Sequence, residues 1–353
     1  MAEEIKLEAG FMCPVPIAAR DAVLLGHGSG GKMSADLLRD LLLPAFQNPF
    51  LARQDDQAIV DINGLRLAFT TDSFVVKPLF FPGGDIGSLA VNGTVNDLAM
   101  GGATPLFLSL AFILEEGLPM DVLRKVIESV SIAAARAGVQ VVTGDTKVVE
   151  KGSGDGLFVN TSGIGLVPDG VRLSANQAQP GDCVILSGSV GDHGITILSQ
   201  REGLAFESPI ESDTAALHTL VAEMLRATSE IRCLRDPTRG GLSSSLNEIA
   251  ACSGVGIELR ESAIPIREEV QGACEMLGLD PMYVANEGKL VAIVSLASAE
   301  PLVETMRRNP LGRDAQIVGT VTAAHPGMVT MRTRLGTSRI VDLLTGDQLP
   351  RIC

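Results

Sequence analysis

The chain has 353 residues, which exceeds one typical domain, so two domains are expected. Hydrophobic residues make up 46% and charged residues 20% of the chain, a composition that excludes disorder over its whole length. A formal net charge of −14 and an aromatic content of 3% argue against a nucleic-acid partner. Phosphate backbones demand surplus Lys and Arg, and bases are usually stacked on aromatic side chains.

The same features place the protein in a reducing, aqueous compartment. No run of residues approaches the ~20 apolar positions of a membrane span, and the acidic start Met1-Ala2-Glu3-Glu4 is unlike a signal peptide. No Cys-x-x-Cys pair occurs, which argues against a disulfide framework and against a zinc site. We therefore expect a cytoplasmic protein without a membrane partner and with reduced cysteines. These are Cys13, Cys183, Cys233, Cys252, Cys274 and Cys353.

The first half of the chain predicts strands that alternate with helices. Residues 1–21 show no clear period and are interpreted as an N-terminal extension. Asn63-Gly64 between two apolar runs predicts a hairpin, Asp85 is placed to cap a helix of small residues, and Gly138 to end the next helix. The predicted strands are 58–61, 65–69, 106–114, 139–142 and 157–164, and the helices 85–100 and 121–137, the latter with Val122, Val126, Ile127 and Val130 on one face.

The second half repeats this mixed pattern after a boundary at Pro168-Asp169-Gly170. We expect an α/β structure of the α+β type, with domains at 22–168 and 169–325. From His325 the chain is rich in Gly and Thr, and Pro350 favours an extended tail over residues 326–353. The predicted strands are 183–187, 290–296 and 316–321, the helices 212–227, 241–252 and 268–277, and a small-residue turn 188–194.

A glycine-rich loop, Gly26-His27-Gly28-Ser29-Gly30-Gly31-Lys32, follows a short apolar run. Its backbone N–H groups can wrap a phosphate, and Lys32 adds positive charge. The spacing satisfies the Gly-x-x-x-x-Gly-Lys pattern of a P-loop, but Met33 stands where that motif needs a hydroxyl for magnesium. The alternative interpretation is a flexible glycine turn.

Four aspartates of the first half predict a cation site. Asp72 and Asp145 each follow a predicted strand, where side chains point toward the ligand crevice of α/β folds. Asp97 lies inside a predicted helix, where Asp has poor propensity, and Asp56 follows the glycine-rich loop. Carboxylates together with nucleotide phosphates suit Mg²⁺. The alternative is that each aspartate caps a helix or belongs to a turn.

The second half adds three candidate groups. Asp236-Pro237-Thr238-Arg239-Gly240-Gly241 precedes a predicted helix, so it forms either an anion site or an ordinary helix cap. Glu287, in Asn286-Glu287-Gly288-Lys289, is either a general base or a solvated loop residue, and His193 is either functional or only packs. Cys353, the last residue, is either a thiol on a mobile arm or a chance cysteine at a frayed end.

Taken together, the ordered motifs are far more specific than any one of them. They closely resemble the HypE family of hydrogenase maturation factors, carbamoyl dehydratases of the AIR synthetase (PurM-like) superfamily, over residues 22–353. The motifs are His27-Gly-Ser-Gly-Gly31, Thr71-Asp-Ser73, Asn96-Asp97, Thr143-Gly-Asp-Thr-Lys147, Gly191-Asp-His193, Arg235-Asp-Pro-Thr-Arg-Gly-Gly241, Asn286-Glu-Gly-Lys289 and Pro350-Arg-Ile-Cys353.

This resemblance implies a fold and a reaction. It implies two α/β domains, with the N-terminal sheets of two subunits paired into a homodimer that frames the ATP site. A HypF-like carbamoyltransferase would load the C-terminal thiol of Cys353. The enzyme would then use ATP to remove water, leaving a protein thiocyanate. The cyano group would pass to iron on a HypC-HypD-like scaffold complex, for the NiFe hydrogenase centre.

The resemblance also implies residue roles. Cys353 would carry the substrate group, Glu287 would act as base, and Lys147 would be its electrostatic partner or a phosphate contact. Mg²⁺ would be held by Asp56, Asp72, Asp97 and Asp145, joined by Asp236, and ATP contacted by Gly28, Ser29, Gly30, Gly31, Asn96, Thr146 and Arg239. Two other hypotheses remain open: a kinase or amide-activating enzyme of the same fold that acts on a free small molecule, and a non-enzymatic scaffold that presents Cys353.

Overall fold

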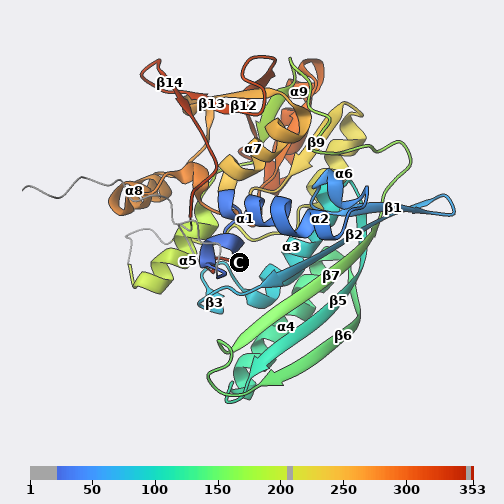
Figure 1. Cartoon of the computed structure of the whole chain (residues 1–353), viewed down its shortest axis with the longest axis vertical. Coiled ribbons are helices and arrows are strands. Elements are labelled where there is room, and N and C mark those ends of the chain that lie inside the picture. Colours follow the sequence, from blue (N-terminus) through green and yellow to red (C-terminus); the bar gives the residue numbers. More distant parts are fainter. Residues whose placement is uncertain (1–21, 205–209, 347–350) are drawn as a thin grey trace, which may run out of the picture.

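The computed structural model describes residues 22–204, 210–346 and 351–353, and it contains two layered halves, each built on a β-sheet (Figure 1). The predicted extension, residues 1–21, lies outside the described residues. The strands are β1 (Ala58–Ile62), β2 (Leu65–Phe74), β3 (Phe80–Phe81), β4 (Gly84–Asp85), β5 (Thr104–Glu115), β6 (Gln140–Val149), β7 (Leu157–Leu166), β8 (Cys183–Leu186), β9 (Ile231–Arg235), β10 (Gly256–Arg260), β11 (Val291–Val294), β12 (Gln316–Thr322), β13 (Val329–Arg332) and β14 (Ser338–Ile340).

Helices fill the connections between these strands. The α-helices are α1 (Lys32–Leu37), α2 (Leu43–Ala45), α3 (Ile86–Met100), α4 (Met120–Ala137), α5 (Asp192–Glu202), α6 (His218–Ala227), α7 (Gly241–Ser253), α8 (Glu268–Leu277) and α9 (Leu296–Arg308). A π-helical turn, Leu38–Leu42, joins α1 to α2, and short 3-10 helices span Leu25–Gly28, Leu51–Arg53, Glu261–Ala263, Pro281–Tyr283 and Pro310–Gly312.

The N-terminal half is a five-stranded sheet in the order β1-β2-β7-β5-β6. The predicted hairpin is confirmed: β1 and β2 pair antiparallel around Asn63 and Gly64, whose φ values of 53° and 85° are those that a tight hairpin turn needs. Helices α3 and α4 cover one face of the sheet, as Figure 1 shows. The other face carries exposed apolar side chains, and β6 forms the outer edge.

Helix α3 begins and packs as its sequence predicts. The Asp85 carboxylate accepts hydrogen bonds from the backbone N–H groups of Gly87 and Ser88, at 2.7 and 3.0 Å. A Cβ at Gly87 would lie 2.6 Å from the carbonyl oxygen of Val126 in α4, so the expected close backbone approach is confirmed. On α4, Val126 is buried as predicted, but Ile127 is 46% exposed, so its placement on the buried face was wrong.

The C-terminal half is a seven-stranded sheet in the order β14-β13-β10-β12-β8-β11-β9, packed on both faces. Leu242, Leu246 and Ile249 of α7 belong to one buried cluster with Val184 and Val291 of the sheet. A second cluster joins α6, α9 and the opposite face of the same strands, and it includes residues 99 and 100 at the end of α3. This shared cluster fixes α3, and the site residues on it, against the C-terminal half.

Several sequence-based boundaries differ from the structure. The predicted strand 139–142 continues to Val149, and the predicted helix 212–227 begins only at His218 because the segment before it is extended. The predicted turn 188–194 opens helix α5, and the stretch interpreted as a tail contains β13 and β14 of the C-terminal sheet. Within the described residues, no helix combines the length and the apolar character needed to cross a membrane.

Candidate active site

Two glycine loops, one near residue 30 and one near residue 240, meet at the junction of the halves. A Cβ at Gly30 would lie 2.6 Å from the carbonyl oxygen of Arg239, so only glycine permits this approach. Ser244 donates a hydrogen bond to the Gly30 carbonyl oxygen at 2.7 Å, and the Arg239 guanidinium donates one to the Gly28 carbonyl oxygen at 3.1 Å. Ser29 donates to the carbonyl oxygens of Gly26 and Gly346. The glycine-rich loop and the loop of Arg239 therefore form one continuous wall of the candidate site.

The glycine-rich loop is not a P-loop. A P-loop connects a strand to a helix, whereas here no strand precedes the loop in the described part of the chain, and its first residues form the 3-10 helix Leu25–Gly28. The loop leads into the short helix α1, capped at Gly31. The loop backbone is held instead by a hydrogen bond from the Lys32 N–H to the Leu344 carbonyl oxygen, at 2.8 Å. The match to the Gly-Lys pattern is coincidental.

Four of the predicted carboxylates gather beside this wall. Burial raises the pKa of Asp56, Asp72, Asp97 and Asp236, and the negative charge of Asp236 raises the pKa of Asp56 and Asp97 further. Asp97 on α3 accepts a hydrogen bond from Thr70 at 2.8 Å. The sequence predicted Asp72 to follow a strand, but it lies inside β2, on the face that packs against α3. Mutual repulsion of this kind marks a place where a cation is strongly stabilised.

Two arginines partly compensate the carboxylates. The Arg235 guanidinium lies 3.2 Å from an Asp56 oxygen and also pairs with Glu248. Arg239 Nη2 lies 4.0 Å from an Asp72 oxygen. Across the described residues, no three His, Cys, Asp or Glu side chains converge into a ready metal site. Hard carboxylate oxygens nevertheless fit Mg²⁺, which commonly takes one or two carboxylates and completes its shell with phosphates and water.

Glu287 is buried, so its interpretation as a solvated loop residue was wrong. Its side chain is 3% exposed, and its Oε1 has no hydrogen-bond partner among the described residues. Burial raises the pKa of this carboxyl well above its ordinary value, with further contributions from the charges of Asp236 and Asp72. A buried acceptor without a partner is rare in native structures and points to a missing ligand or proton donor. The Oε1 atom of Glu287 is therefore available to contact a ligand.

The C-terminal thiol reaches this same place. Cys353 is 8% exposed and lines a cavity of about 300 Å³ together with Gly28, Ser29 and Arg239. Burial raises the pKa of the Cys353 thiol, while the Arg239 charge opposes this and the charge of Glu287 adds to it. In this docked position the thiol is protonated at neutral pH and is a poor nucleophile. In Figure 1 the C-terminus lies at the junction of the halves, near α1, α5 and β3.

Main-chain hydrogen bonds hold the tail in this position. The backbone N–H groups of Val75 and Lys77 donate to the carbonyl oxygens of Cys353 and Arg351, at 3.1 and 3.3 Å. The imidazole Nε2 of His193 lies 2.8 Å from the Ile352 carbonyl oxygen. The Ile352 side chain belongs to a buried cluster shared by β2, α3 and α5. The last residues are thus held by their main chain without forming a regular strand, since Arg351 has a φ of 56°. Pro350, used to predict an extended arm, lies outside the described residues.

Three predicted site residues lie elsewhere. Asp145, Thr146 and Lys147 are inside β6, at the outer edge of the N-terminal sheet, not at a strand end. Lys147 pairs with Asp145 at 2.8 Å, and both side chains are more than half exposed. Asp145 aligns with Ser73 of β2 across two intervening strands, so about 14 Å of sheet separates them. Within one protomer these residues do not reach the tail.

Asn96 takes a role that the sequence did not suggest. Its amide nitrogen donates to the carbonyl oxygens of Ala215 and Glu287, at 3.0 and 3.3 Å, and its oxygen accepts from the Leu217 N–H. It thereby fixes the loop of Glu287 to α3. Sequence reasoning also missed Ser212 and Asp213, because the segment Glu-Ser-Asp-Thr reads as the start of a helix.

Comparison with known proteins places this geometry in a family. A model described as AIR synthase related protein, N-terminal domain, matches residues 54–167, and the corresponding C-terminal domain model matches residues 179–331. The chain is 58% identical over 332 residues to carbamoyl dehydratase HypE of Azotobacter vinelandii, covering 94% of this chain and 97% of that protein. The chain belongs to the HypE family.

Solved structures of HypE proteins agree with this assignment. A HypE crystallised in complex with ATP has 49% sequence identity and a TM-score of 0.80, over 94% of this chain and 100% of that one. A HypE–HypF complex contains a chain of 49% identity with a TM-score of 0.83, over 87% of this chain and 99% of that one. The predicted two-domain PurM-like architecture is thereby confirmed.

Proposed function

We propose that this HypE-family chain dehydrates a carbamoyl group carried on Cys353 to a thiocyanate, at the expense of ATP, and so supplies cyanide for hydrogenase maturation. One observation carries the proposal: the C-terminal thiol docks in a cavity that also contains the glycine loop and Arg239, beside the unpartnered carboxylate of Glu287. A carrier thiol, an anion-binding wall and a base are what this dehydration requires.

The chemistry follows from the groups present. The carbonyl oxygen of the thiocarboxamide attacks the γ-phosphorus of ATP, and ADP leaves. Departure of phosphate then breaks the C–O bond and the carbon–nitrogen triple bond forms, while the nitrogen gives up both its protons, one to Glu287 and one to the departing phosphate. Glu287 accepts a proton from that nitrogen, because its buried Oε1 has no hydrogen-bond partner among the described residues. Arg239 and the N–H groups of the glycine loop neutralise charge on the transferred phosphoryl group.

Magnesium fits the carboxylate cluster. Asp56, Asp72, Asp97 and Asp236 would hold the ion together with nucleotide phosphates, and the ion would neutralise phosphate charge. The protein itself compensates part of the negative charge of these carboxylates: the Arg235 guanidinium lies 3.2 Å from an Asp56 oxygen and keeps that carboxylate oriented. Asn96 positions the loop of Glu287 and would contribute to the ATP site through it.

The tail works in two positions. While docked, the Cys353 thiol has a raised pKa, and 8% of the residue is exposed, so it is unsuited to attack an incoming carbamoyl donor. Loading by a HypF-like carbamoyltransferase, and delivery to iron on a HypC-HypD-like scaffold, require the tail to leave the cavity. Dehydration requires it to return.

A second copy of the chain would complete the site. The open face of the N-terminal sheet exposes large apolar side chains, each between 39% and 49% exposed, which in a monomer is a liability. Asp145 and Lys147 lie on this same face, beside Ala111 and Ile113 of β5. Face-to-face packing of two sheets would bury the apolar set and carry these two charged residues to the partner's carboxylates. The apolar set is Phe69, Phe107, Ile113, Ile164 and Leu166.

Mixed dimers test this assignment. We expect Lys147→Ala and Cys353→Ala homodimers each to be inactive. A heterodimer of the two, purified through two different tags, has one site with an intact Cys353 and an intact Lys147 from the opposite subunits. It should recover about half of the wild-type activity, because one of its two sites is complete. Dehydration is measured as loss of water from the loaded C-terminal peptide.

Lys151→Ala is the matched control, since Lys151 lies just beyond β6 and is also exposed. It should leave activity unchanged. An inactive heterodimer would show that Lys147 does not act across the subunit interface.

The alternative of a kinase or amide-activating enzyme for a free small molecule is not favoured. It gives no role to a C-terminal thiol that docks beside Arg239 and Glu287. A purely structural scaffold is equally disfavoured, because it would have no need of a buried carboxylate without a partner.

A further inference from the structure

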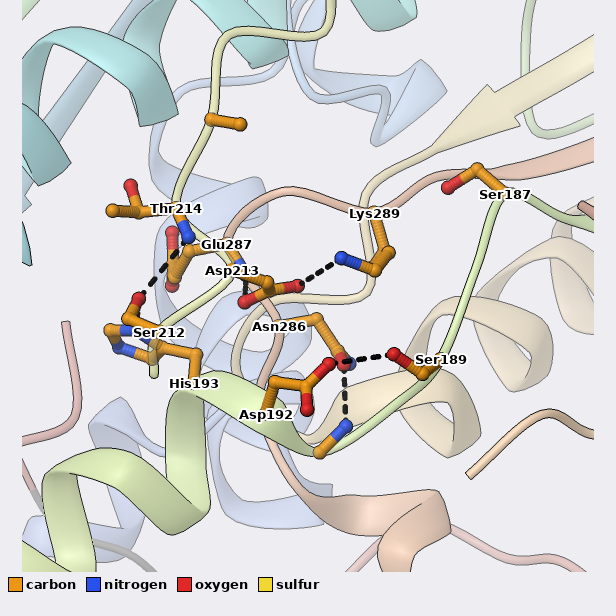
Figure 2. Close-up of polar contacts among 12 residues, drawn as sticks. Ser187, Ser189, Asp192, His193, Ser212, Asp213, Thr214, Asn286, Glu287 and Lys289 are labelled. Atoms are coloured by element: carbon orange, nitrogen blue, oxygen red, sulfur yellow. Dashed lines mark hydrogen bonds and ion pairs between the residues drawn. The ribbon is translucent and has the colours of Figure 1, made fainter. Parts of the chain in front are cut away.

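A buried polar network connects His193, which contacts the docked tail, to the loop that carries Glu287; Figure 2 shows His193, Ser212, Asp213 and that loop. His193, near the start of α5, is fully buried, and its ring packs edge-on against Phe81 with centroids 5.6 Å apart. Its Nε2 lies 2.8 Å from the Ile352 carbonyl oxygen, and its Nδ1 lies 2.7 Å from Ser212 Oγ. The network is separate from the carboxylates proposed to hold magnesium.

The Ile352 carbonyl fixes the tautomer of His193. A carbonyl oxygen can only accept, so Nε2 carries the proton and Nδ1 accepts from the Ser212 hydroxyl, whose oxygen in turn accepts the Thr214 N–H at 3.2 Å. His193 is then neutral with its proton on Nε2, which donates to the Ile352 carbonyl oxygen. Burial lowers the pKa of His193, against the opposing charge of Asp213, and keeps the imidazole neutral.

The neighbouring residue, Asp213, holds the base. One of its oxygens accepts the Glu287 N–H at 3.0 Å, and the other pairs with Lys289 at 3.1 Å. A Cβ at Gly288 would collide with the Asp213 carbonyl oxygen. Only glycine at position 288 therefore lets the loop of Glu287 lie this close to Asp213. Figure 2 shows Asp213 between Glu287 and Lys289, with Ser212 next to His193.

We propose that His193 is a positioning residue for the reaction. It binds the Ile352 carbonyl of the returning tail, and Ser212 with the adjacent Asp213 connects it to the loop of Glu287. His193 thereby aligns the tail with the base. The inference rests on the proposed role of Cys353 as carrier. Removing His193 leaves a buried carbonyl without a donor and shifts the tail toward its free position. It does not touch the thiol, the nucleotide site or Glu287 itself.

Tail position and dehydration are measured separately. In His193→Ala we expect Cys353 to react with iodoacetamide roughly tenfold faster, as the loss of one buried hydrogen bond implies. Loading of Cys353 by the carbamoyltransferase should be unchanged or faster, while single-turnover dehydration of the loaded protein slows by about the same factor. In His193→Gln, whose amide nitrogen can reach the Ile352 carbonyl, both effects should be largely reversed. A merely structural role for His193 would show no such opposite pair of changes.

Two further variants keep the test decisive. Ser212→Ala removes the group that orients the His193 ring. Like His193→Ala, it should speed alkylation of Cys353 and slow dehydration, but both changes should be smaller. His218→Ala, at a half-buried histidine of α6 away from the tail, should change neither. Dehydration at the wild-type rate in His193→Ala, or equal losses in His193→Ala and His193→Gln with unchanged alkylation, would overturn the inference. Residual cyanide formation by Cys353→Ala would instead overturn the proposed function, whatever His193 does.

Discussion

We expect Cys353→Ala to lower the rate of dehydration by at least about a thousandfold, while ATP binding persists. The expectation follows from the docked tail: the thiol is the atom that lines the cavity with Arg239, whereas the glycine loop and the carboxylates do not depend on it. Formation of thiocyanate is measured as a mass change of the C-terminal peptide, and ATP binding by calorimetry on the same sample. Small-molecule turnover would continue in this variant if the protein acted on a free substrate.

The matched control is Cys252→Ala. Cys252 is a half-buried free thiol at the end of α7 that packs against the C-terminal core and not against the tail. We expect near-normal activity. Equal losses in the two variants would indicate a general effect of removing a thiol, and would contradict a carrier role for Cys353.

Asp236→Asn has two consequences of opposite sign. Turnover of ATP should fall on the order of a hundredfold or more, because the substitution removes a carboxylate from the cluster proposed to hold magnesium and phosphate. The nucleotide-free protein should nevertheless become more stable than wild type at neutral pH. Burial raises the pKa of Asp236 to about 6, although Arg235 opposes the shift, so the folded protein holds this charge at a cost.

The contribution of Asp236 to the free energy of unfolding depends on pH. An unfolded Asp titrates near pH ~3.9, so the folded state of wild type binds more protons than the unfolded state between about pH 4 and pH 6. The contribution of Asp236 to stability is complete below about pH 4 and is lost as the pH rises through about 6. The difference in free energy of unfolding between Asp236→Asn and wild type should therefore grow across this window, to about 3 kcal/mol. Urea denaturation at several pH values measures it; a flat difference would show that Asp236 is not strained by its neighbours.

Local features of the fold were predictable because their causes are local. Asn63-Gly64 imposes a hairpin, Asp85 satisfies the first N–H groups of α3, and Gly138 ends α4 in the left-handed conformation that other residues avoid. The expected helix 212–227 failed for the opposite reason. Ser212 and Asp213 are extended because their partners, His193 and Lys289, lie on other elements.

The sequence suggested candidate site residues by type, but it did not indicate which of them the fold brings together. Glycine loops and aspartates signal phosphate and cation chemistry by residue type, and the order of motifs identified the family. Burial of Glu287 and docking of Cys353 depend on interactions between residues far apart in the sequence, such as Glu287 with Asp72 and Cys353 with Arg239, which no local pattern encodes. Lys147 and Asp145 lie on the exposed edge strand β6, so under the proposed function a second copy of the chain would have to bring them to the site.

Intact mass of the protein is the most direct measurement. The purified chain is incubated with its carbamoyltransferase, carbamoyl phosphate, ATP and Mg²⁺, and the modification is mapped to the C-terminal peptide. We predict that the peptide first gains one carbamoyl group and then loses one water only when ATP is present. A Cys353 that stays unmodified while ATP is still consumed on a free amide or amine would contradict the carrier role of the tail.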